Sequence, residues 1–110
     1  MDQELRRFRR IASQHTVLVK RLGSAEIEEF AATTAIGLGG CGFTSDERIA
    51  DGEVLELLIS ARPEVISAKA RVVYTQLLPS GKHEIGVEFI SLPEMDREKI
   101  QQLLEVTEAK

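Results

Sequence analysis

Residues 66–74 read ISAKARVVY, and apolar side chains in this stretch alternate with polar ones. Every second residue from Ile66 to Tyr74 is apolar, whereas the intervening positions as far as Arg71 are polar or basic. Successive side chains of a β-strand point to opposite faces, so this period of two predicts a strand with one buried and one solvated face. The buried face is predicted to carry Ile66, Ala68, Ala70, Val72 and Tyr74.

Four further segments with the same alternation lie between residues 15 and 90. They are residues 17–20, 30–38, 54–61 and 84–90. In the second of these the alternation predicts one shared face for Phe30, Ala32, Thr34, Ile36 and Leu38, and a bare face of small residues opposite. Short strands of this kind, separated by turn residues, are typical of an antiparallel sheet.

Glycine, proline and polar residues separate these segments. The GGCG run at 39–42 is too rich in glycine for a strand interior and predicts a bulge or corner, with positive φ at Gly40 and Gly42. Residues 44–52, TSDERIADG, predict a polar loop, and residues 79–82, PSGK, predict a hairpin turn.

The hydrophobic period changes to that of a helix after Pro93. An apolar stripe with helical spacing is formed by Ile100, Leu103, Leu104 and Thr107. Residues 91–94 resemble a capping box, which predicts that the helix begins there. Short antiparallel strands followed by one amphipathic helix predict a small closed or nearly closed barrel flanked by that helix.

The composition is that of one small globular domain. The chain has 110 residues, of which 43% are hydrophobic and 29% charged, and its net charge is −4. This balance argues against a general nucleic-acid coat, and no apolar run approaches the roughly 20 residues of a membrane helix. The arginine-rich N-terminus is not followed by an apolar segment, and Cys41 is the lone cysteine. We therefore expect a cytoplasmic domain without a secretory signal or membrane insertion.

Candidate catalytic and metal-binding residues are few. The histidines and the cysteine, at His15, His83 and Cys41, do not have the spacing of metal-ligand pairs. The carboxylates of the 44–52 loop have no accompanying nucleophile or metal motif. Aromatic residues make up 5% of the chain and Trp is absent, which leaves little to stack on nucleic-acid bases. The sequence therefore predicts neither an enzyme nor a metal or cofactor protein, and no DNA or RNA partner.

Three motifs follow one another along almost the whole chain. They are Arg6-x-x-x-Arg10, the IGLGG run at 36–40, and the GVEFISLP run at 86–93. In this order and spacing the chain resembles the PilZ domain family. The resemblance implies a mainly β fold, a six-stranded antiparallel PilZ-type β-barrel with a C-terminal α-helix. It divides the chain into a flexible arginine-rich arm, residues 1–14, and the barrel with its helix, residues 15–110.

The resemblance also implies a site for the bacterial second messenger cyclic di-GMP. The family's arginine motif clasps the phosphates and guanine faces, and an Asp/Asn-x-Ser-x-x-Gly motif holds the guanine edges. By position, the arginine motif corresponds to Arg6 and Arg10, with Arg7 as an additional candidate, and the second motif to Ala35, Gly37 and Gly40. Gly40 matches the motif, but Ala35 replaces the Asp or Asn and Gly37 replaces the Ser.

Two functions stay open on these residues. Arginine binds phosphate through paired hydrogen bonds and stacks on purines, which favours a non-enzymatic cyclic di-GMP receptor that signals through an unidentified bacterial protein partner. Each guanine group left without a partner costs about 1–3 kcal/mol if buried, which favours an adaptor that no longer binds the ligand. Strand alternation points Thr34 away from the Ala35 face, so the sequence predicts no substitute there. A third, less favoured hypothesis is a small barrel that binds RNA through its arginine arm.

Overall fold

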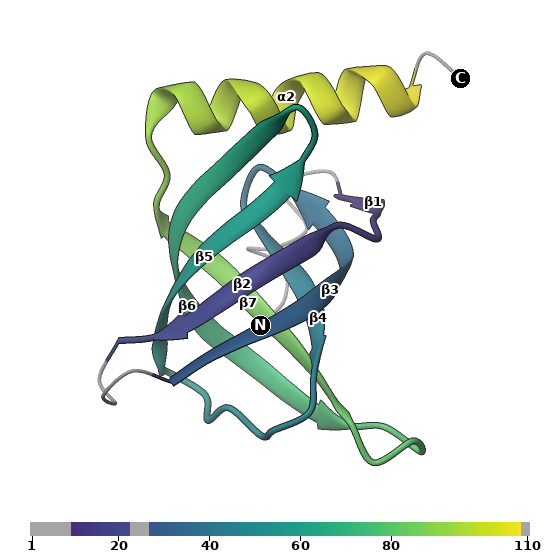
Figure 1. Ribbon diagram of the computed structural model, residues 1–110, viewed down its shortest axis with the longest axis vertical. Coiled ribbons are helices and arrows are strands. Elements are labelled where there is room, and N and C mark those ends of the chain that lie inside the picture. The colour runs from purple at the N-terminus through teal and green to yellow at the C-terminus, as the bar shows by residue number, and fades with distance from the viewer. Residues whose placement is uncertain (1–9, 23–26, 109–110) are drawn as a thin grey trace.

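The protein, described here from a computed structural model covering residues 10–22 and 27–108, is an antiparallel β-barrel with one helix across an end (Figure 1). The sheet order is β3-β2-β5-β6-β7-β4, and pairing of β4 with β3 closes the ring, so the expected six-stranded barrel is confirmed. A short strand, β1, pairs with residues 35–37 of β3, whereas β2 pairs with residues 27–32 of the same strand. The elements are β1 (Arg10–Ala12), β2 (Thr16–Arg21), β3 (Ile27–Gly37), β4 (Gly40–Ser45), β5 (Val54–Ala61), β6 (Glu64–Leu77), β7 (His83–Ser91) and α2 (Glu94–Glu108).

The barrel interior is filled by the alternating apolar residues that the sequence pattern indicated. On β5, and on β6 from Ile66 to Val72, every second side chain is buried, as the alternation predicts. Fully buried side chains include Val17, Phe43, Leu55, Leu57, Ile59, Ile66, Val72, Ile85 and Val87. These side chains form one contiguous cluster, and their removal from water is the main stabilising term of such a small domain.

Tyr74 departs from the predicted pattern on β6. Its side chain is 37% exposed and lies on the outer face, whereas the alternation placed it inside with Val72. The pairing of β6 with β7 shifts register between Val72 and Tyr74, so that Tyr74 pairs with Gly86. An irregularity in the register reverses the face on which later side chains lie, and this one moves Tyr74 out of the core.

A second irregularity changes the faces of β3. The sequence places Phe30 and Ile36 on one face, but Phe30 is 74% exposed and Ile36 is fully buried. The pairing of β3 with β4 shifts between Thr33 and Ala35, as in a β-bulge. Consequently Thr33 points into the barrel, Thr34 is exposed, and Ala35 lies on the outer side of Ile36 with its cross-strand partner Gly42. The expectation that Thr34 and Ala35 face opposite ways is therefore wrong.

The turns use glycine where the backbone needs a positive φ. The predicted hairpin at 79–82 is present, with Gly81 at φ 91° and the amide of Leu78 donating to the carbonyl of Lys82 at 2.8 Å. Among the described residues the glycines with positive φ are Gly52 and Gly81. The positive φ expected at Gly40 and Gly42 is therefore wrong, and these glycines have another role.

The loop between β4 and β5 contributes to the core. The sequence predicts a polar loop over residues 44–52, but Thr44 and Ser45 belong to β4. Most of the remaining segment is exposed, whereas Ile49 is only 1% exposed. The hydroxyl of Thr75 donates to the backbone carbonyl of Ile49 at 2.5 Å, which ties the loop to β6. In Figure 1 this loop lies at the end of the barrel opposite α2, so Ile49 closes the core at that end.

Helix α2 lies across the other end of the barrel and contacts β6, β3 and β1 (Figure 1). The predicted stripe is the buried face of the helix, with Ile100 fully buried, Leu104 nearly so and Leu103 half-buried. Thr107, the last residue of the stripe, has no described side chain. Near the start of the helix, Asp96 accepts a hydrogen bond from the backbone amide of Ser67 at 2.9 Å. None of the described helices is both long and apolar enough to cross a bilayer.

Candidate functional site

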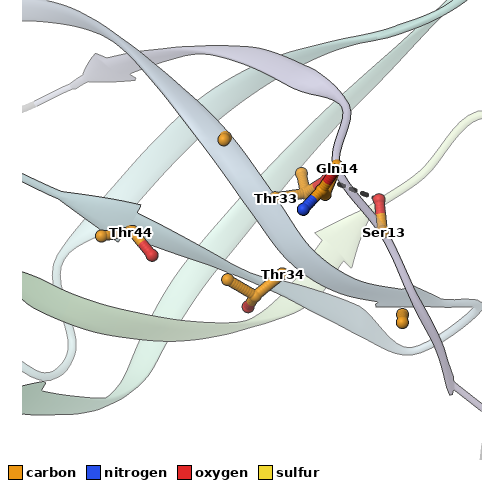
Figure 2. Close-up of a pocket in the computed structure, with 7 residues that line it drawn as sticks. Ser13, Gln14, Thr33, Thr34 and Thr44 are labelled. Atoms are coloured by element: carbon orange, nitrogen blue, oxygen red, sulfur yellow. Dashed lines mark hydrogen bonds between the residues drawn. The ribbon is translucent and has the colours of Figure 1, made fainter.

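A shallow, open concavity of about 840 Å³ lies on the outer face of β3, beside the chain that leaves β1 (Figure 2). Hydroxyl-bearing residues of two strands, β3 and β4, and of the connection between β1 and β2 contribute most of its polar groups. Its lining residues are Ala12, Ser13, Gln14, Ala32, Thr33, Thr34 and Thr44. In Figure 2, Thr34 and Thr44 project from the neighbouring strands β3 and β4.

A hydrogen-bond network fixes the connection between β1 and β2 to β3. The hydroxyl oxygen of Ser13 lies 2.5 Å from that of Thr33 and 2.6 Å from Nδ1 of His15. The backbone amide of His15 donates to the Thr33 hydroxyl, and the amide of Ser13 donates to the carbonyl of Thr34. Because these bonds satisfy buried polar groups, they hold the β1–β2 connection, and hence β1, in one register on β3.

Arg10 stands at the start of β1, opposite Gly37 of β3. Its Nη2 atom is buried without a hydrogen-bond partner. Burial raises the pKa of the Cys41 thiol to about 12 and also raises the pKa of the Tyr74 phenol. The positive charge of Arg10 opposes both shifts, and a side-chain hydrogen bond from Arg10 also opposes the shift of the Tyr74 pKa. The guanidinium therefore lies close to both residues, and one of its nitrogens has no acceptor.

A row of small residues forms the outer surface next to Arg10. Ala35 pairs with Gly42, Gly42 with Gly86, and Gly86 with Tyr74, so the row crosses β3, β4, β7 and β6. A Cβ atom on Gly86 would overlap the Tyr74 ring, which shows that the ring lies against bare backbone. The negative charge of Glu84 adds to burial in raising the pKa of Tyr74. The Tyr74 ring thus covers Gly86, whereas Ala35 at the other end of the row is half-buried.

Glu84 places a carboxylate over the same row. The Thr34 hydroxyl donates to Oε2 of Glu84 at 2.6 Å, and the Thr44 hydroxyl to Oε1 at 3.4 Å. A Cβ atom on Gly42 would lie 2.8 Å from Oε2 and 3.0 Å from the Thr34 hydroxyl oxygen. Gly42 therefore leaves the space that the Thr34–Glu84 pair occupies beside Ala35.

Gly40 allows β4 and β7 to approach closely. It pairs with Glu88, and a Cβ atom there would overlap the carbonyl oxygen of Val87. These backbone atoms cannot rotate away from the added Cβ atom, as the end of a side chain could. The glycine at this position is therefore required for strand pairing, whatever else it does.

The chain was also compared with known proteins. The sequence model of the PilZ domain matches residues 4–106. The chain belongs to the PilZ domain family. No curated protein sequence matches it.

Solved structures similar to this PilZ domain include members from three bacteria. The Bacillus subtilis inhibitor of motility MotI/DgrA has a TM-score of 0.79 and 21% identity, over 93% of this chain and 50% of that one. The PilZ domain of Escherichia coli YcgR with c-di-GMP has a TM-score of 0.75 and 12% identity, over 94% of this chain and 91% of that one. The K. pneumonia MrkH–c-di-GMP complex has a TM-score of 0.72 and 15% identity, over 92% of this chain and 50% of that one. At these identities the likeness establishes the fold, and the chain spans about half the length of MotI and MrkH.

The PilZ fold brings together part of the predicted site. Pairing of β1 with β3 sets Arg10 opposite Gly37 and Ala12 opposite Ala35. Gly40 stands at the start of the next strand, in contact with β7. Arg6 and Arg7 lie outside the described residues.

Sequence reasoning missed three residues of this surface, Thr34, Tyr74 and Glu84. Thr34 and Tyr74 reach the outer face because of register shifts, which strand alternation does not reveal. Glu84 was recognised as a strand residue, but its hydrogen bond to Thr34 spans 50 positions of sequence. No local signal in the sequence places the three side chains together on the outer face of the barrel.

Proposed function

We propose that this PilZ domain is a non-enzymatic receptor module that binds cyclic di-GMP on the surface between Arg10 and Ala35 and signals through a protein partner. The family assignment supports the proposal, as do the c-di-GMP complexes among the similar structures. The observation that carries it is the Nη2 atom of Arg10, which is buried without an acceptor beside the small residues of β3.

The chemistry of an arginine in this position suits a phosphodiester. A buried charged donor without a partner is costly, and a phosphate oxygen would remove that cost while forming a charge-assisted hydrogen bond. Beside it, Ala35 is half-buried and has only a methyl side chain, so a purine can approach the backbone there closely. Arg6 and Arg7 precede Arg10 in sequence and are proposed as additional ligands of the same molecule.

The remaining chemistry of the concavity favours binding over catalysis. Ser13, one of its lining residues, has its hydroxyl against the imidazole of His15, but Ser13 is 6% exposed and shares its hydroxyl with Thr33. A serine nucleophile must reach its substrate, which this one does not. The proposal places the module in the cytoplasm, where Cys41 would stay a buried free thiol.

A second function is favoured by a specific feature of the same surface. Ala35 and Gly37 lack the polar side chains of the family motif, and the Glu84 carboxylate next to them repels phosphate. A PilZ-like adaptor that acts through protein contacts alone would have this composition. The two candidates differ in one measurable property, the affinity for cyclic di-GMP.

Isothermal titration calorimetry with cyclic di-GMP decides between them. The receptor proposal expects saturable binding that Arg10→Ala weakens by about tenfold to a hundredfold, the worth of a charge-assisted hydrogen bond. Arg48→Ala removes the same side chain from an exposed position of the β4–β5 loop and should leave affinity unchanged. Absence of binding at millimolar ligand, by a protein shown to be folded by circular dichroism, would establish the adaptor function instead.

A further inference from the structure

The Thr34–Glu84 pair is a polar group on this surface to which no role has been assigned so far. It consists of a hydroxyl from β3 and a carboxylate from β7, joined at 2.6 Å over Gly42. Thr34 and Thr44 line the concavity, and Glu84, which is half-buried, is hydrogen-bonded to both of them at its border. The pair is therefore within reach of a molecule bound there.

Two unusual backbone features are needed to bring these side chains together. The shift in pairing between Thr33 and Ala35 turns Thr34 to the outer face, and Gly42 leaves the space into which the carboxylate fits. With any larger residue at Gly42, Oε2 of Glu84 and the Thr34 hydroxyl would have to move. The carboxylate is thus held in one place beside Ala35 by two hydroxyl donors, Thr34 and Thr44.

The Glu84 carboxylate can accept further hydrogen bonds beyond these two contacts. A carboxylate has about four lone-pair sites, and the two threonine hydroxyls use one on each oxygen. The edge of guanine offers two adjacent N–H donors, at N1 and N2, which match two oxygens of one carboxylate. Adenine presents a lone pair at N1 instead, which a carboxylate repels. A fixed carboxylate on a bare surface beside a cation therefore fits a guanine nucleotide better than an adenine one.

We propose that Glu84, held by Thr34 and Thr44, accepts hydrogen bonds from the guanine edge and so selects a guanine dinucleotide at this site. The inference rests on the proposed function. Glu84 of β7 would supply the acceptor, and Thr34 at the β3 irregularity the hydroxyl, that Ala35 and Gly37 do not supply.

Neutralising the carboxylate distinguishes this role from a merely electrostatic one, because the two predict effects of opposite sign. If Glu84 only stands near the ligand, Glu84→Gln removes a repulsive charge and strengthens binding of any dianionic dinucleotide. If Glu84 reads guanine, the glutamine replaces one acceptor by an N–H₂ group that faces the guanine donors. Binding of cyclic di-GMP then weakens while binding of cyclic di-AMP does not.

The experiment measures calorimetric affinities of cyclic di-GMP and cyclic di-AMP for the wild type and Glu84→Gln. We expect a loss of about tenfold to a hundredfold for cyclic di-GMP and a loss of discrimination between the two nucleotides. Glu56→Gln makes the same charge change on β5, which is neither β7 nor a neighbour of it, and should change neither affinity. Thermal melting followed by circular dichroism shows that each variant is folded.

A relocated carboxylate provides the second arm. Ala35 lies on the outer face next to Gly42, so Ala35→Asp in the Glu84→Gln background returns an acceptor to the same space and should recover selectivity for cyclic di-GMP. Unchanged or tighter cyclic di-GMP binding by Glu84→Gln overturns the inference and leaves the receptor function standing. Absence of cyclic di-GMP binding by the wild type overturns the receptor function and the inference together.

Discussion

Replacing Gly40 by alanine tests whether the packing of β4 against β7 requires a glycine at this position. A Cβ atom at position 40 would overlap the carbonyl oxygen of Val87 and lie 3.0 Å from its carbonyl carbon and 3.1 Å from Cα of Glu88. All three atoms belong to the backbone of β7. Relief of the overlap therefore requires β4 and β7 to separate, by on the order of 1 Å if carbon atoms are to reach their usual distance.

The cost follows from what that separation disrupts. Such overpacking costs about 1–3 kcal/mol. The hydrogen bond from the amide of Phe89 to the carbonyl of Gly39, now 2.9 Å, would lengthen beyond the usual range and cost about 0.5–1.5 kcal/mol more. Alanine returns about 0.4–1 kcal/mol by restricting the unfolded chain. We expect Gly40→Ala to lower the free energy of unfolding by about 2–3 kcal/mol, or Tm by about 8–12 °C.

Urea unfolding followed by far-UV circular dichroism measures this change. Gly42→Ala is the matched control, two residues further along the same strand. A Cβ atom at position 42 would meet the ends of the Glu84 and Thr34 side chains, which can rotate away, so its cost should stay below about 1 kcal/mol. Equal stabilities of Gly40→Ala and the wild type, within about 0.5 kcal/mol, would refute the reasoning from strand packing.

Two further predictions concern the core. Ile100→Ala should lower the free energy of unfolding by about 2–5 kcal/mol, because this fully buried side chain joins α2 to the barrel core. Urea unfolding measures the change, and a value below about 0.5 kcal/mol would mean that the helix is not docked. Burial raises the pKa of Cys41 to about 12, above the roughly 8.5 of an unfolded thiol, so the folded state keeps its proton at a pH where the unfolded state loses it. Stability should be independent of this thiol below about pH 8.5 and fall as the pH rises above it, by up to about 1.4 kcal/mol per pH unit. The urea midpoints at pH 8 and pH 10 should therefore differ more for the wild type than for Cys41→Ala, and equal differences would contradict the assignment.

Only the residues of the candidate site that belong to a linear sequence motif could be predicted. Arg10, Ala35 and Gly37 were selected from spacing, and the β1–β3 pairing places them on neighbouring strands. The spacing could not show that Nη2 of Arg10 is buried without a partner, nor that Gly40 is fixed by contact with β7. Both facts depend on atoms of strands that are distant in sequence.

The sequence by itself determined five of the barrel strands, the terminal helix and the hairpin at 79–82, because regular burial leaves a period in the residues that any one element presents to the core. It therefore located Leu57, Ile66 and Ile100 inside the protein without knowledge of their neighbours. It missed β4, Gly40–Ser45, which it predicted as a glycine-rich corner and the start of a polar loop. Only the tertiary structure decided which outer side chains share a surface. The shift that exposes Thr34 is a mismatch in length between paired strands, which exists only once β4 lies beside β3. Glu84 meets Thr34 because closure of the barrel joins strands 50 residues apart, and no local pattern encodes that contact.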